Sequence, residues 1–360
     1  MIPEDSKWSA RDRLRWLGTA AAAGMMPALA ADTEEYPRNL TKEDIDRWMR
    51  ELSNWGRWGK DDQAGTYNLI TAAKRKQAAA LVKEGISVSM ALNADIAPKD
   101  APPEPAPAAD SGGRGGRGDF PRYTWQHVMR SNGLNLRGAS GYAVDTISVN
   151  FHGNNTTHFD ALSHFIFEGH IYNGFPASSI TNWGAEKNDA LPFKDGFFTR
   201  GVLIDWPRFK NVPYMGDDEA IYAQDLDDWE KKSGIQIESG DCVLLRTGRW
   251  KRVAEKGPLD LNRQAPGLYA SCAKWLKERN IALLGSDVVQ DVRPSRVEGV
   301  NQPIHQLFLV AVGTPLFDNC DLEAVAGQAA KLRRSTFCMT VSLLRVPGAT
   351  GGPFNPIATF

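Results

Sequence analysis

The chain has 360 residues, of which 42% are hydrophobic and 24% charged, a composition typical of globular proteins and too apolar for a disordered one. Its 42 Lys and Arg residues balance 43 Asp and Glu residues to a formal net charge of -1, which disfavours nucleic acid and anionic lipid as partners. The four cysteines form no CxxC pair, so we interpret them as buried small residues rather than a zinc knuckle or redox dithiol.

Residues 1–31 have the layout of an export signal. Three arginines within 11–15 precede a soft apolar stretch over 16–29, and the Ala-Leu-Ala that follows offers a small-residue cleavage site. Asp12 interrupts the Arg-Arg pair of a twin-arginine signal, so the export pathway stays open. We expect a periplasmic mature protein with no membrane span. The alternative is a cytoplasmic protein with an amphipathic N-terminal helix.

Helix and strand signals alternate after this segment. Thr41 is followed three residues later by Asp44, which is a helix start signal, and Gly85 stands where a second helix would end. The pattern predicts a helix over 41–52, an ordered loop over 54–70, a helix over 71–84 and a strand over 86–92.

Residues 97–118 form a Pro-, Ala-, Gly- and Arg-rich insertion that is too poor in large apolar groups to fold, and we expect a disordered surface loop. It contains a GxGxxG string that starts at Gly113. Since no strand precedes this string and no helix follows it, we do not expect dinucleotide binding. Its few arginines give little affinity for RNA.

The chain beyond Tyr123 alternates short β-rich runs with helical patterns. Runs at 201–206 and 241–248 predict strands, and a helical pattern over 266–279 precedes another β-rich run at 281–287. This alternation predicts an α/β fold, although the order of the strands does not follow from it.

Four of the six histidines fall between residues 152 and 170. His158, Asp160 and His164 form an HxDxxxH pattern. Residues two apart on an extended segment face the same side, so His158 and Asp160 can point at one ion. An imidazole beside a carboxylate suits zinc or manganese. The alternative is a set of surface or hydrogen-bonded core histidines.

This pattern resembles the HxGTHxDxxxH signature of the cyclase family, which includes bacterial kynurenine formamidases and isatin hydrolases. The resemblance runs from Asn54 to Phe360 and includes NWGRWGKDDQAGTYNLI, GHIYNG, RGVLID, GDCVLLRTG, PGL, GSD, HQLFLVAVGTPLFDNCDLE and RVPGATGGPFNP. It implies a single cyclase-like catalytic domain over 32–360. The implied fold is a swivelling β/α/β domain with a mixed sheet or barrel-like β core flanked by helices, and the implied assembly is a homodimer.

The resemblance also implies roles for particular residues. His158, Asp160 and His305 correspond to metal ligands, and His164 corresponds to the catalytic histidine. A late glutamate of the family pattern is replaced by Asp318, which we keep as a candidate ligand.

The second departure is Asn154, which stands where the family has its first histidine ligand. His152 can take that place if the chain turns at Gly153, because glycine permits unusual backbone angles. The Asn154 carbonyl can instead bind a hard ion such as manganese. Asp287 and Asp291 can support ligands from behind, or act simply as caps or ion-pair partners.

The implied chemistry is hydrolysis by a metal-activated water. A zinc or manganese ion would lower the pKa of bound water toward about 7 and polarise a carbonyl, and His164 can accept the water proton. We expect a small-molecule substrate: a cyclic or linear amide, or a lactone. Candidate substrate contacts are Trp55, Trp58, Phe165 and Tyr172.

The sequence leaves two other functional classes open and disfavours two more. A metal-dependent cyclase or dehydratase would use the same groups, and a non-catalytic relative could have lost its metal through the change at Asn154. No GxSxG elbow and no GxxxxGK[ST] loop occurs in the sequence, which disfavours serine hydrolase and P-loop chemistry.

Overall fold

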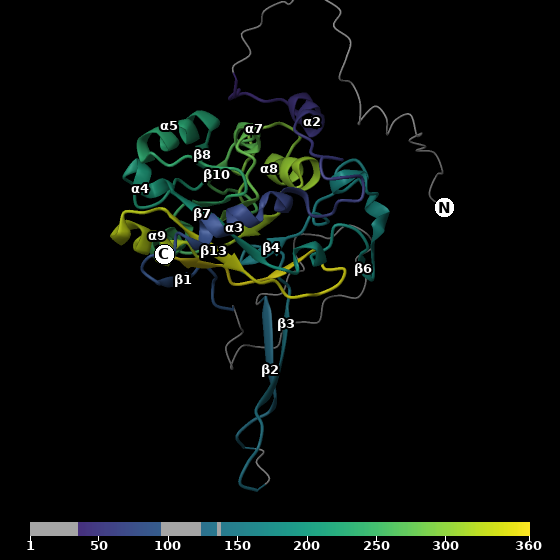
Figure 1. Cartoon of the computed structure of the whole chain (residues 1–360), viewed down its shortest axis with the longest axis vertical. Helices are drawn as coiled ribbons and strands as arrows, with labels where there is room; N and C mark the ends of the chain where they lie inside the picture. Colours follow the sequence, from purple (N-terminus) through teal and green to yellow (C-terminus); the bar gives the residue numbers. More distant parts are fainter. Residues whose placement is uncertain (1–34, 95–123, 135–137) are drawn as a thin grey trace, which may run out of the picture.

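The computed structural model describes residues 35–94, 124–134 and 138–360 (Figure 1). The expected export signal over 1–31 and the expected loop over 97–118 lie outside these ranges. Within the described ranges, each helix is too short or too polar to cross a lipid bilayer.

A mixed sheet of nine strands forms the centre of the molecule. Its strand order is β1-β15-β13-β7-β9-β11-β12-β4-β14. The strands β7, β9, β11 and β12 run parallel, whereas the pairs toward both edges are antiparallel. The bounds are β1 Ser87–Ser89, β4 His158–Asp160, β7 Phe197–Asp205, β9 Cys242–Arg246, β11 Leu283–Ser286, β12 Leu316–Asp318, β13 Thr336–Val341, β14 Gly351–Pro353 and β15 Ile357–Thr359.

Helices flank this sheet, and Figure 1 shows α2, α5, α7 and α8 gathered on one side of it. The α-helices are α2 Lys42–Glu51, α3 Ala72–Ala79, α4 Trp206–Lys210, α5 Ala223–Ser233, α6 Arg249–Lys256, α7 Ser271–Glu278, α8 Pro303–His305 and α9 Glu323–Leu332. The 3-10 helices are η1 Gly65–Leu69, η2 Tyr172–Gly174, η3 Ala177–Ser179 and η4 Leu191–Phe193, and η5 Gln306–Val312 is a π-helix. A mixed sheet flanked by helices confirms the α/β class.

Local signals predicted the bounds of α2 closely and those of α3 and α7 less closely. Thr41 caps α2 in a capping box with Asp44, as expected. The helix predicted over 71–84 is α3, which ends early because the N–H groups of Glu84 and Gly85 donate to the carbonyl of Phe360 instead. The helix predicted over 266–279 begins only at Ser271, since β10 precedes it.

The side chains beneath β4 form an aromatic core. Phe159 lies between two site residues and, because side chains alternate along a strand, points to the opposite face. Its ring centroid lies 5.2 Å from Phe193, 5.9 Å from Phe197 and 6.2 Å from Phe317. Burying one such ring stabilises the fold by roughly 1.5–3 kcal/mol, so this cluster anchors β4. The four cysteines are buried and free, as expected.

Three two-stranded sheets complete the fold: β2 Trp125–Ser131 with β3 Val144–Val149, β5 Ile180–Thr181 with β6 Gly184–Ala185, and β8 Ala220–Ile221 with β10 Gly267–Leu268. The ribbon of β2 and β3 projects away from the body of the molecule (Figure 1). Its second strand ends three residues before His152, so the ribbon leads directly into the candidate site.

Candidate metal centre

Strand β4 and its neighbour β12 bring three polar side chains to one face of the sheet. His158 and Asp160 lie two residues apart on β4, and Asp318 on β12 is opposite His158 in the register. Opposite residues of an antiparallel pair point to the same side. Each of the three residues is less than 5% exposed.

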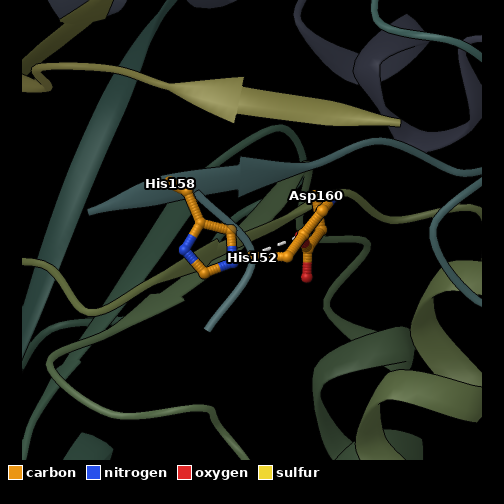
Figure 2. A group of neighbouring side chains, drawn as sticks. All are labelled: His152, His158 and Asp160. Carbon is orange, nitrogen blue, oxygen red and sulfur yellow. Dashed lines mark ion pairs between the residues drawn. The ribbon is translucent and has the colours of Figure 1, made fainter. Parts of the chain in front are cut away.

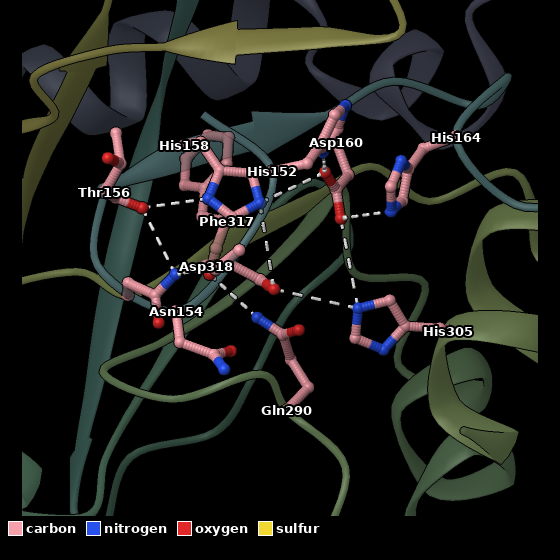
Figure 3. Close-up of polar contacts among 12 residues, drawn as sticks. His152, Asn154, Thr156, His158, Asp160, His164, Gln290, His305, Phe317 and Asp318 are labelled. Carbon is pink, nitrogen blue, oxygen red and sulfur yellow. Dashed lines mark hydrogen bonds and ion pairs between the residues drawn. The ribbon is translucent and has the colours of Figure 1, made fainter. Parts of the chain in front are cut away.

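Asp160 lies at the centre of the site, with four imidazoles around its carboxylate (Figure 3). Figure 2 shows two of them, those of His152 and His158, beside Asp160. Its Oδ1 atom lies 3.1 Å from Nδ1 of His152 and 3.4 Å from Nε2 of His158. Its Oδ2 atom lies 3.7 Å from Nε2 of His164 and 3.9 Å from Nε2 of His305. The two histidines of the HxDxxxH pattern, together with His152 and the distant His305, thus surround the carboxylate of Asp160.

Hydrogen bonds on the far side of two rings direct them into this cluster. Nδ1 of His158 donates to the carbonyl of Thr156 at 2.9 Å, so Nε2 faces inward, toward Asp160. Nδ1 of His305 lies 2.6 Å from Oδ2 of Asp291, and Nε2 of the same ring lies 3.8 Å from Oδ2 of Asp318. Such backing of a ligand ring is usual at metal sites.

The charges in the cluster shift the pKa values of two buried histidines upward. Burial alone would lower the pKa of His158, but the carboxylates of Asp160 and Asp318 outweigh it and raise the pKa to about 9. Burial is likewise outweighed at His305, where the hydrogen bond to Asp291 and the nearby carboxylate of Asp318 raise the pKa to about 10. Both imidazoles therefore sit in a strongly negative environment that attracts cations.

His164 behaves in the opposite way. Burial lowers its pKa to about 4, with the neighbouring imidazoles of His152 and His305 adding to the effect of burial and Asp160 opposing it. His164 is therefore neutral near pH 7. Burial raises the pKa of Asp160, but His164 and His158 more than reverse this and hold the pKa well below its usual range.

The residues present fit a divalent cation. Both carboxylate oxygens of Asp160 and Oδ1 of Asp318 are buried without a hydrogen-bond partner in the described part of the chain. Buried carboxylates left in this way are costly unless they are neutralised. Two groups have donor atoms within 4.8 Å of one another, namely His152 with His158 and Asp160, and Asp160 with His305 and Asp318. Imidazole and carboxylate donors suit zinc or manganese.

His152 and Asn154, the two candidates for the missing histidine ligand, are placed differently in the structure. His152 reaches Asp160, and its Nε2 lies 3.0 Å from Oγ1 of Thr350. The turn that this requires is present at Gly153, with a φ of 150°. The backbone carbonyl of Asn154 accepts a hydrogen bond, but within the described ranges its side chain makes none to the cluster.

The four aromatic candidates for substrate contact are dispersed. The ring of Phe165 lies 6.3 Å from the ring of His305 and so borders the cluster. Tyr172 is fully buried and donates to an aspartate of the 54–70 loop. Trp55 donates to a backbone carbonyl of η5, and Trp58 packs against an arginine. Phe165 is therefore the candidate whose position best fits a substrate.

Sequence reasoning missed residues that support the site from a distance. Arg249, Asn319 and Thr350 all contact the segment from His152 to Thr156. The resemblance assigned these three residues no role, although Asn319 and Thr350 lie within the motifs that carry it. Asp287 instead accepts hydrogen bonds from backbone N–H groups at the start of α6, which is the capping role considered for it.

Comparison with known proteins identifies the fold. The Cyclase family model matches residues 67–290. The crystal structure of a novel cyclase is 28% identical, with a TM-score of 0.72, and the match covers 87% of this chain and 99% of that one.

Two isatin hydrolases A share the fold at 19% identity. The one from Ralstonia solanacearum has a TM-score of 0.51, with coverage of 76% of this chain and 91% of that one. The one from Labrenzia aggregata has a TM-score of 0.52, with coverage of 79% and 96%. No curated protein matches the sequence. With more than half of its length matched by the family model and the fold shared throughout, the chain belongs to the cyclase family.

Proposed function

We propose that the protein is a metal-dependent hydrolase that opens a cyclic or linear amide, or a lactone, of a small molecule. One observation carries the proposal: a fully buried carboxylate, Asp160, whose two oxygens face four imidazole nitrogens and accept no hydrogen bond from the residues that the structure describes. The isatin hydrolases that share the fold act, by name, on isatin, which is a cyclic amide. This supports an amide or a related acyl bond as the target.

The ligands in this proposal are His158, Asp160, His305 and Asp318, with His152 completing the set. A bound zinc or manganese ion would supply a water of lowered pKa and polarise the carbonyl of the substrate. The hydrogen bonds of His158 and His305 to their backing acceptors keep the Nε2 atoms aimed at the ion.

His164 moves the proton. Its side chain is 30% exposed, whereas those of His158 and His305 are 3% exposed, so it lies on the side from which substrate arrives. Because it is neutral, Nε2 can accept a proton from water and then deliver it to the leaving nitrogen or oxygen. Phe165 borders the same site and offers an apolar contact for the substrate.

The test is metal analysis combined with substrate assays on the full chain. The protein is stripped with a chelator, reloaded with zinc or manganese, and assayed with isatin, N-formylkynurenine and simple lactones. We expect about one ion per chain and hydrolysis of at least one substrate class, both lost in His158→Ala and kept in Lys231→Ala, which changes an exposed lysine of α5. A chain that binds no metal, or a loaded chain that only condenses or dehydrates its substrates, would refute the hydrolase.

We also propose a homodimer, formed through the β2–β3 ribbon. In the register of this ribbon, Trp125 and Met129 share one face with Ile147 and Val149. The ion pair of His127 and Asp145 lies on the same face, and Met129 and Ile147 are 44% and 59% exposed. An isolated two-stranded ribbon is marginally stable in water. Pairing with a second copy lets the two identical faces cover the exposed side chains of Met129 and Ile147.

Analytical ultracentrifugation tests this assembly. We expect a dimer for the wild type and a monomer for Met129→Lys combined with Ile147→Lys, because two lysines would be buried in the interface. A wild-type monomer, or a variant that remains dimeric, would exclude this interface.

A further inference from the structure

Two buried side chains from distant segments hold the turn that precedes β4 through its backbone carbonyls. The Nδ2 group of Asn319 donates to the carbonyl of Gly153 at 2.7 Å and to that of Thr156 at 3.2 Å. The Nη2 group of Arg249 donates to the carbonyl of Asn154 at 2.6 Å. Three carbonyls of one four-residue turn are thus fixed by two side chains from distant segments.

These two side chains also hold each other. Nη1 of Arg249 donates to Oδ1 of Asn319 at 2.6 Å and to the carbonyl of Asp287 at 3.3 Å. Asn319 is fully buried and Arg249 is 5% exposed. A buried guanidinium is tolerated only where acceptors surround it, so this arrangement fixes both side chains in one position. We call Arg249 and Asn319 the turn clamp.

The clamped turn determines where His152 lies. Six residues in a straight strand would carry the chain roughly 20 Å from His152 to His158. Instead, the two ring centroids are 5.3 Å apart. The chain folds back over the clamped carbonyls, and Nδ1 of His152 comes within 3.1 Å of Asp160.

The ring of His152 has close neighbours on two sides. Oγ1 of Thr350 lies 3.0 Å from Nε2 of His152. The next residue is Gly351, where a Cβ atom would lie 3.2 Å from Cε1 of His152. On the other side, the ring of His164 stacks on His152 at 4.0 Å, with an interplanar angle of 15°. His152 is therefore held in place from several directions, and its Nδ1 atom is left facing Asp160.

We propose that the turn clamp sets the cation affinity of this site, by positioning His152 as the donor that takes over from the side chain at position 154. The inference rests on the proposed function, because it assumes that the cluster holds a divalent ion. Arg249 and Asn319 are positioning residues that touch neither ion nor substrate. Asn154 contacts the turn clamp through its backbone carbonyl. Its side chain is therefore dispensable for cation binding.

The test measures dissociation constants for zinc and manganese, by competition with a chromophoric chelator, on the full chain. We expect His152→Ala and Arg249→Lys each to weaken binding by about 10- to 100-fold, the usual effect of a lost supporting contact. The double variant should be no weaker than His152→Ala alone, because both changes act through one ligand. Arg246→Lys is the matched control, since Arg246 is a buried arginine that is paired with Asp205 and Glu323 instead.

Two further measurements guard against simple misfolding. Asn319→Asp keeps the oxygen that Arg249 contacts and removes the amide donors to the turn, so we expect the same loss of affinity with a near-native melting temperature. With cobalt as the probe ion, the visible absorption of Arg249→Lys should match that of His152→Ala. Asn154→Ala should bind like the wild type.

The outcomes separate the clamp from the proposed function. Additive losses in the double variant, or an Asn154→Ala protein as weak as His152→Ala, would overturn the clamp while the metal site stands. A wild-type chain that binds neither zinc nor manganese would overturn both.

Discussion

Replacing His164 with alanine should separate proton transfer from metal binding. Nε2 of His164 lies 3.7 Å from Oδ2 of Asp160, but His164 belongs to neither group of closely spaced donors. We therefore expect the variant to keep its metal. Loss of a general acid/base lowers kcat by roughly 10²- to 10⁴-fold, which corresponds to about 3–5 kcal/mol of transition-state stabilisation.

The structure also indicates how His164→Ala affects stability and access of solvent to the site. The variant loses the stacking contact between His164 and His152, an interaction worth roughly 0.5–1.5 kcal/mol. The melting temperature should then fall by only a few degrees. Because the side chain is 30% exposed, its removal leaves a space that solvent can reach, and added imidazole should restore part of the activity.

The assay is kcat/KM of the metal-loaded enzyme with and without imidazole, next to metal content and a thermal melt. Lys231→Ala, which changes an exposed residue of α5, serves as the control. Wild-type turnover in His164→Ala would place the proton-transfer group elsewhere, and loss of the ion would make His164 a ligand.

Three other outcomes follow from the contacts around the cluster. Changing His158 or Asp160 to alanine should remove most bound metal, as elemental analysis would show; full occupancy in both variants would contradict the site. Asp291→Asn should weaken metal binding by about 10- to 100-fold, because Asp291 orients His305, and an unchanged dissociation constant would argue against that role. Gly313→Ala should lower the melting temperature without touching the site, since a Cβ there would lie 2.2 Å from a buried tyrosine ring; a native melt would contradict the packing described.

Short-range features of the site were predictable from the sequence. The spacing of His158 and Asp160 is enough to place both on one face of a strand, and the structure has them there. Thr41 and Asp44 likewise identify their own helix start. Such signals work because the interacting groups are separated by only a few bonds along the chain.

Long-range features could not be derived in this way. His305 and Asp318 were identified by resemblance, because no local pattern says which distant segment will lie beside β4. The early end of α3 depends on a contact with the last residue of the chain, Phe360. The clamp by Arg249 and Asn319 was missed for the same reason, since a side chain that binds a distant carbonyl leaves no periodic trace in the sequence.

The place of β4 in the sheet bears on how the protein folds. This strand of three residues is paired between β12 and β14, and both follow it by more than 150 positions in the chain. Closing such large loops costs entropy that nearby contacts cannot offset, and folds dominated by distant pairings form slowly. During synthesis, the histidines of the 152–164 segment would emerge long before the strands that flank them. The cation site is therefore assembled only when the C-terminal strands have docked, and its formation reports on completion of the whole fold.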